Sequence, residues 1–118
     1  FTPGLKDIEG YERIWVLFWL HQSKDYELQV VPYRDTVKRG VFATRAPMRP
    51  NPIGISSIRL DKVEGNKLHV SEVDLLDGTP IIDIKPYSMQ FDNFETSRNG
   101  WLDDSSEIRD AADKRFEK

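Results

Sequence analysis

The fold of this chain is decided by one stretch, Thr44-Arg45-Ala46-Pro47-Met48-Arg49-Pro50-Asn51-Pro52-Ile53-Gly54-Ile55-Ser56. Its three prolines lie within six residues, and each fixes φ at about −65° and lacks a backbone N–H donor. A helix or a central strand across residues 47–52 is therefore excluded. We predict a stiff loop, with Gly54 allowing the backbone to turn or to be approached closely before an apolar strand resumes at Ile55.

Polar side chains stand on this stiff loop. Guanidinium and amide groups suit a carboxylate, a phosphate or a purine edge, and the loop carries Arg45, Arg49 and Asn51. Lys38 and Arg39 precede it, so four positive charges gather within a dozen residues of an acidic protein. We expect this patch to meet phosphate. The alternative is a proline-stiffened crossover whose arginines are simply solvated.

Composition narrows the class of protein. The 118 residues are enough for one domain with a single core. No apolar run approaches the roughly 18 residues of a membrane span, and Phe1-Thr2-Pro3-Gly4 has no signal-peptide character, so we predict a cytoplasmic protein. The absence of cysteine excludes disulfides and thiol catalysis, and two distant histidines argue against a metal centre. A net charge of −3 argues against broad nucleic-acid binding but allows a local basic patch.

The apolar pattern predicts a mainly β chain. Residues 14–20 form an apolar run that we expect to be a strand buried on both faces. A turn or brief 3₁₀ segment is expected at 5–11, and one short helix at 104–117. Further strands are predicted at 28–33, 40–44, 55–63, 67–70 and 81–87, with a hairpin joining 55–63 to 67–70.

Three motifs resemble one known family. They are GLKDIEG at 4–10 leading into a strand that ends FWLHQ at 18–22, GVFATRAPMRPNPIGIS at 40–56, and DLLDGTPIIDIKPY at 74–87. Together they closely resemble the TsaA-like (YaeB-like) family, and the resemblance covers Gly4 to about Asp92. It implies a small YaeB-like β-barrel, and the absence of a G-x-G-x-x-G motif agrees with a fold that is not a Rossmann methyltransferase. Bacterial members are tRNA adenine-N6 methyltransferases that use S-adenosylmethionine to methylate threonylcarbamoyl-adenosine next to the anticodon.

The resemblance implies a cofactor site that can be mapped residue by residue. Carboxylates of the 74–77 segment would accept from a ribose hydroxyl or an ammonium, its leucines would flank the adenine, and Arg45 would meet the methionine carboxylate. The positions that match the family's cofactor site are His21, Gln22, Arg45, Ile55, Asp74, Leu75, Leu76 and Asp77.

Roles in methyl transfer and in tRNA binding are our hypothesis, based on the chemistry that this reaction requires. We expect Asn51 to orient the acceptor through its amide oxygen, with Asp83 or Asp77 accepting the proton. The alternative for Asn51 is that it caps the backbone of its own loop, and for Asp83 that it pairs with Lys85. The residues expected to hold tRNA phosphates are Lys38, Arg39 and Arg49.

Two departures from the family keep other functions open. Members usually start with an additional N-terminal strand that touches the cofactor, and bacterial members carry a further C-terminal domain that handles tRNA, whereas residues 1–118 match a single TsaA-like domain. The resemblance also implies a homodimer with the cofactor near the subunit interface. The alternatives are a methyltransferase of the same fold with another substrate and a cofactor-binding module without turnover.

Overall fold

The computed structural model describes residues 1–20, 25–33 and 35–104, and the chain divides into two compact units. The sheet unit comprises Phe1–Ser23 and Asn51–Asn93, and the loop unit comprises Lys24–Pro50 and Phe94–Lys118. His21 and Gln22 lie outside the described residues, as does the helix predicted over 104–117 apart from Asp104.

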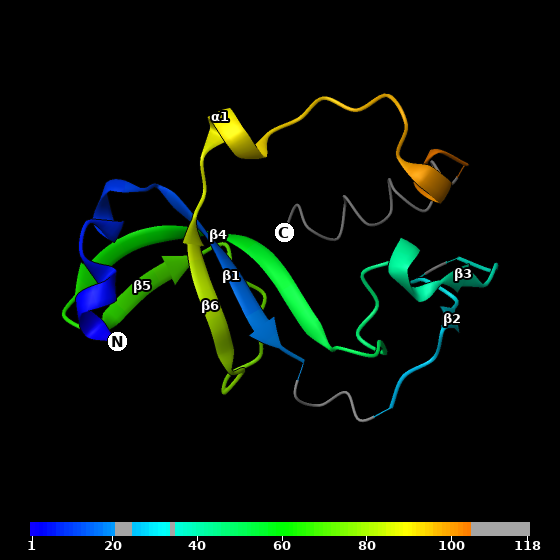
Figure 1. Ribbon diagram of the computed structural model, residues 1–118, viewed down its shortest axis with the longest axis horizontal. Helices are drawn as coiled ribbons and strands as arrows, with labels where there is room; N and C mark the ends of the chain where they lie inside the picture. Colours follow the sequence, from blue (N-terminus) through cyan, green and yellow to red (C-terminus); the bar gives the residue numbers. More distant parts are fainter. Residues whose placement is uncertain (21–24, 34, 105–118) are drawn as a thin grey trace. The chain divides into compact units, whose positions relative to one another are not determined.

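The sheet unit is built on a four-stranded antiparallel sheet (Figure 1). Its strands are β1 (Arg13–Trp19), β4 (Ile53–Glu64), β5 (Lys67–Ser71) and β6 (Ile81–Pro86), in the order β5-β4-β1-β6. The central strand β1 places Ile14 opposite Ile58 of β4, and Val16 opposite Ile84 of β6. The chain therefore enters the sheet at its centre and adds neighbours on both sides.

One face of this sheet carries the core. Ile14, Val16, Ile58 and Leu60 are buried and pack together, because alternate residues of a strand point to the same face. The prediction that residues 14–20 are buried on both faces was wrong, since Trp19 on the other face is 40% exposed. The run is apolar throughout, but in the sheet unit only one of its faces packs on the core cluster.

Local turn chemistry shapes the rest of the sheet unit. The predicted hairpin is confirmed, with Gly65 at φ +60° between β4 and β5. The 3₁₀-helices η1 (Thr2–Leu5) and η2 (Ile8–Gly10) confirm the brief turns expected near the start of the chain. A one-turn helix, α1 (Met89–Asp92), follows β6.

The loop unit contains much less strand than predicted. Its elements are β2 (Gln29–Val30), β3 (Arg39–Gly40), and the 3₁₀-helices η3 (Val41–Ala43) and η4 (Gly100–Asp104). The predicted strand at 28–33 is only two residues long, and Pro32 offers no N–H donor to extend it. The predicted strand at 40–44 was wrong, because the backbone and the hydroxyl of Thr44 both donate to the Val41 carbonyl and close a 3₁₀ turn.

The mainly β character is confirmed, and the strands within the described ranges form a four-stranded and a two-stranded sheet. A closed barrel is not found among them, and the barrel stays a prediction. Over the same part of the chain, no helix has the length and apolar character to cross a membrane.

Candidate functional site

The proline-rich stretch folds into a loop whose backbone is fastened around Arg45. On its N-terminal side, Thr44 donates its N–H and its hydroxyl to the Val41 carbonyl, at 3.1 and 2.9 Å. On its C-terminal side, the Ala46 N–H donates to the Thr44 hydroxyl oxygen at 3.2 Å. Arg49 donates to the residues on both sides of Arg45, because its Nη1 lies 3.0 Å from the carbonyl oxygens of Thr44 and Ala46. The backbone on either side of Arg45 is thus held by side chains of the same loop.

Arg45 itself is presented to solvent. Its side chain is exposed, and no hydrogen bond or ion pair to another described residue engages its guanidinium. Because the backbone on both sides of this planar cation is already held, little backbone freedom is lost when the guanidinium binds an anion. Arg45 is therefore prepared to receive a carboxylate or a phosphate.

The other cations of the patch differ in how they are used. Arg49 donates to carbonyls within the loop, and Arg39 pairs with Asp35, whose carboxylate lies 3.1 Å from its Nε. Lys38 is exposed, with no partner among residues that the structure describes. Of the four cations in the patch, Lys38 and Arg45 are thus the two whose charges are not engaged by another described residue.

Asp35 explains how one of these cations is held. Burial raises the pKa of this carboxyl, but the N–H of Thr36, the Arg39 guanidinium and the N–H of Val37 outweigh it and lower the pKa below its ordinary value. Asp35 is therefore ionised at neutral pH and neutralises Arg39.

Asn51 begins the return into the sheet unit. Its carbonyl accepts from the Ile53 N–H at 2.7 Å, whereas its side chain is exposed and makes no hydrogen bond within the described ranges. The amide is consequently available to a ligand, and capping of its own loop by this side chain is not seen there.

The 74–77 segment connects β5 to β6 and presents two kinds of side chain. Leu75 packs against the core cluster, whereas Leu76 is 61% exposed. Thr79 fastens the segment, donating its N–H and its hydroxyl to the Leu76 carbonyl at 3.1 and 2.6 Å. Asp74 and Asp77 are exposed, and neither makes an ion pair with a described residue. Two free carboxylates therefore flank one exposed and one packed leucine.

Asp83 lies on β6 in a different environment. The Lys85 ammonium is 3.2 Å from its Oδ2, and the Ile84 N–H donates to its Oδ1 at 2.9 Å. Both interactions favour the carboxylate, Lys85 most strongly, and they lower the pKa of Asp83 below its ordinary value. The alternative for Asp83, pairing with Lys85 on one strand face, is therefore seen in the structure, and this pairing makes Asp83 a weak proton acceptor.

Ile55 and Gly54 mark where the loop becomes strand β4. Ile55 is 49% exposed and lies opposite Leu17 of β1. Gly54 lies opposite Phe18, whose ring covers it so closely that a Cβ at this position would be 2.3 Å from Phe18 Cε2. The motif glycine is needed for this close approach of ring and backbone.

The structure distributes the predicted site residues over both units. Asn51, Ile55, the 74–77 segment and Asp83 belong to the sheet unit, and the four cations belong to the loop unit.

Sequence reasoning missed Thr44 and Trp101. The signal for Thr44 was its place at the start of a proline-rich loop, where Ser and Thr hydroxyls commonly bond nearby backbone. Trp101 gave no signal beyond being an isolated tryptophan in a polar tail.

These features define a mainly β chain whose loop unit displays a preorganised arginine loop and whose sheet unit carries a short carboxylate-bearing connection. The chain belongs to the family described as the tRNA-methyltransferase O N-terminal domain, whose model matches residues 1–93. The resemblance that the three motifs carry is thereby confirmed.

Several relatives give the range of proteins that contain this domain. A probable S-adenosyl-L-methionine-binding protein of Pyrococcus abyssi is 53% identical over 87% of this chain and 56% of its own length. A tRNA (adenine(37)-N6)-methyltransferase of Mus musculus is 44% identical over 76% of this chain and 22% of its own length. A crystal structure of TrmO from Pseudomonas aeruginosa superposes with a TM-score of 0.67 at 41% identity, covering 84% of this chain and 42% of that one. The chain thus spans about half or less of the length of these three relatives.

Proposed function

We propose that this domain binds S-adenosylmethionine and directs its methyl group to the N6 of threonylcarbamoyl-adenosine next to the anticodon of a tRNA. The observation that supports this most directly is Arg45, an exposed guanidinium on a fastened backbone within the family motif. Membership in the methyltransferase family and relatives named for S-adenosylmethionine binding support the choice of cofactor. The cytoplasm, where tRNA is modified, is the expected location.

The available side chains suit the cofactor by their chemistry. Arg45 would bind the methionine carboxylate, and Asp74 or Asp77 would accept hydrogen bonds from the ribose hydroxyls or the ammonium group. Leu76 is the better candidate to cover the adenine, because Leu75 already packs on the core. The cofactor positions proposed for this chain are His21, Gln22, Arg45, Ile55, Asp74, Leu75, Leu76 and Asp77.

The protein's part in the reaction would be orientation and proton acceptance. The bound cofactor supplies an electrophilic methyl group on its sulfonium. Asn51, whose amide has no hydrogen-bond partner among the described residues, would orient the acceptor base. The proton released from N6 would pass to Asp77 rather than to Asp83, because Lys85 and the Ile84 N–H stabilise the ionised form of Asp83.

The substrate would be attracted by the cations of the loop unit. Residues 24–50 contain six Lys and Arg against three Asp and Glu, a formal net charge of +3 in a chain whose total is −3. Lys38 is proposed as a direct phosphate contact, with Arg39 and Arg49 contributing mainly charge, since both are already bonded within the loop unit. A homodimer and a closed barrel of the family type are part of the same proposal.

A second candidate function is methylation of a different substrate by the same fold. It is favoured by the internal use of two of the predicted phosphate ligands, Arg39 by Asp35 and Arg49 by two carbonyls. A cofactor-binding module without turnover is the third alternative. Cofactor binding without a methylated product from a complete set of tRNAs would favour this module, and transfer to another acceptor would favour the second candidate.

Calorimetric titration with S-adenosylmethionine tests the cofactor site. We expect Arg45→Ala to weaken binding roughly 10- to 100-fold, the range for loss of a hydrogen bond to a charged group. Arg59→Ala is the matched control, because Arg59 is an exposed arginine of the sheet unit that pairs only with Asp61 in the described structure, at 3.3 Å. Equal binding by wild type and Arg45→Ala would contradict the assignment of Arg45.

A further inference from the structure

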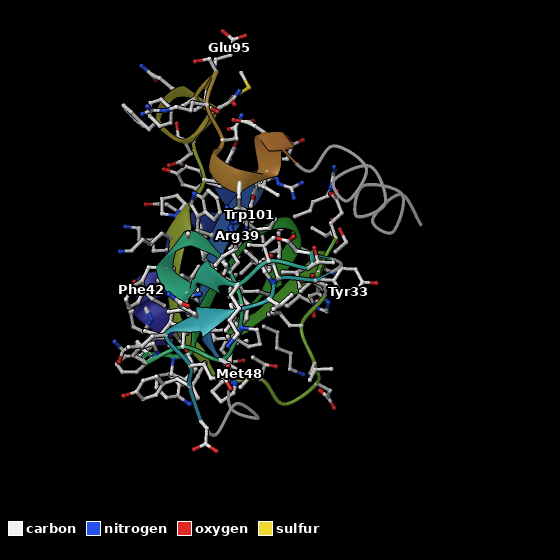
Figure 2. The ribbon with its side chains drawn as sticks, turned by 90° about the vertical axis from the view of Figure 1, so that its right-hand side faces the viewer. Tyr33, Arg39, Phe42, Met48, Glu95 and Trp101 are labelled. Carbon is white, nitrogen blue, oxygen red and sulfur yellow. The ribbon has the colours of Figure 1, made fainter. Side chains whose placement is uncertain are left out.

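A tryptophan beyond the matched domain is fastened to the start of the Arg45 loop. The Trp101 Nε1 donates to the Ala43 carbonyl at 2.8 Å, and the Arg39 guanidinium carbon lies 5.5 Å from the centre of its ring. Figure 2 shows Arg39 and Trp101 next to each other, where β3 and η4 meet within the loop unit. The family match ends at residue 93, so Trp101 lies outside the matched residues, whereas Arg39 and Ala43 lie within them.

The Trp101 contact lies at the end of the turn that leads into the Arg45 loop. Ala43 is the last residue of η3, and the next residue, Thr44, anchors the N-terminal side of Arg45. Val41 at the other end of η3 is 1% exposed, and its N–H donates to the Leu28 carbonyl at 2.9 Å. The turn that leads to Arg45 is therefore held at its first residue by burial and at its last by Trp101.

Trp101 also orders the cation that precedes the turn. The Arg39 guanidinium contacts both the ring of Trp101 and the carboxylate of Asp35, so it has two partners. Trp101 thus contacts both ends of the segment from Arg39 to Ala43.

We propose that Trp101 is a positioning residue for Arg45. By holding the Ala43 carbonyl and the Arg39 guanidinium, it restricts the backbone conformations open to Arg45 and raises the affinity of that guanidinium for an anionic group. Under the proposed function, on which this inference rests, the anionic group is the methionine carboxylate of S-adenosylmethionine. The segment that follows the matched domain is then part of the cofactor site's support.

The test compares two ligands that differ in one group. Trp101→Phe keeps an aromatic ring near Arg39 but removes the N–H donor, and Leu102→Ala is the control at the next residue of η4. We expect Trp101→Phe to weaken S-adenosylmethionine binding roughly three- to tenfold. Its effect on decarboxylated S-adenosylmethionine, which lacks the carboxylate, should be less than twofold.

A double-mutant cycle gives the second arm. If Trp101 acts through Arg45, Trp101→Phe should weaken binding much less when Arg45→Ala is already present. Equal weakening of both ligands, or additive effects of the two substitutions, would overturn the proposal by showing that Trp101 only stabilises the fold.

Amide hydrogen exchange decides the positioning claim independently of the ligand. The Ala46 N–H, which donates to the Thr44 hydroxyl, should exchange faster in Trp101→Phe than in Leu102→Ala. Equal exchange in the two variants would overturn the claim. A wild-type protein that fails to bind S-adenosylmethionine would instead overturn the proposed function, and the exchange result would still decide whether Trp101 holds the loop.

Discussion

Substituting Gly54 with alanine should destabilise the sheet unit through one aromatic ring. A Cβ at this position would lie 2.3 Å from Cε2, 2.4 Å from Cζ and 3.0 Å from Cδ2 of Phe18. Gly54 does not have a left-handed φ, so the backbone conformation itself would accept alanine. The cost therefore comes from displacing Phe18, which packs against the core cluster.

The magnitude follows from the cost of overpacking. Displacing a packed ring to admit one methyl group costs about 2 kcal/mol. For a chain of 118 residues, this corresponds to a fall in Tm of roughly 8 °C. Thermal and urea unfolding of the wild type and Gly54→Ala measure it directly. Gly10→Ala is the control, since a Cβ there meets nothing within 4 Å.

A second substitution tests the stated cause. Phe18→Leu removes the ring atoms nearest to Gly54, so adding Gly54→Ala to it should cost less than about 0.5 kcal/mol. If Gly54→Ala destabilises the protein equally in the Phe18→Leu background, the ring is not the reason and the close-approach argument fails.

Four further predictions concern Arg49, Lys38 and Asp35 of the loop unit and Asn51. Arg49→Met should weaken S-adenosylmethionine binding several-fold, because it releases the two carbonyls that Arg49 holds. Lys38→Met should leave this binding unchanged and should reduce the salt dependence of tRNA binding by about one unit of slope. Identical salt slopes for Lys38→Met and wild type would exclude the phosphate contact. Because the folded-state pKa of Asp35 is lowered, the ionised carboxylate stabilises the folded protein above the unfolded pKa of about 3.9. Unfolding of wild type and Asp35→Asn should therefore differ at neutral pH and converge as pH falls through the folded pKa, and a constant difference would refute this linkage. Asn51→Ala should lower the methylation rate at least about tenfold with unchanged cofactor affinity, and full turnover would refute its role.

Local signals predicted the sheet unit better than the loop unit. The hairpin around Gly65 and strand β6 were predictable because alternation and turn residues act over a few neighbouring positions. The strand predicted at 40–44 failed because Thr44 bonds back to Val41. Trp101 then adds a bond to Ala43 from 58 residues away, which no short window of sequence reveals.

In the candidate site, too, some features could be predicted from local sequence and others depend on how the loop folds. The exposure of Arg45 and Asn51 was foreseeable, because prolines keep their loop out of regular structure. The role of Arg49 was not, since its two carbonyl acceptors come together only when the loop folds. Leu75 and Leu76 are identical neighbours in sequence, and only the packing of one against the core separates them.

Transfer of an isotopically labelled methyl group tests the central claim most directly. The protein would be incubated with methyl-labelled S-adenosylmethionine and total tRNA, and the digested nucleosides analysed by mass spectrometry. We predict labelled N6-methyl-threonylcarbamoyl-adenosine with the wild-type protein and a strong reduction with Arg45→Ala. Binding of S-adenosylmethionine without a labelled nucleoside from any tRNA would contradict the proposed tRNA methyltransferase activity.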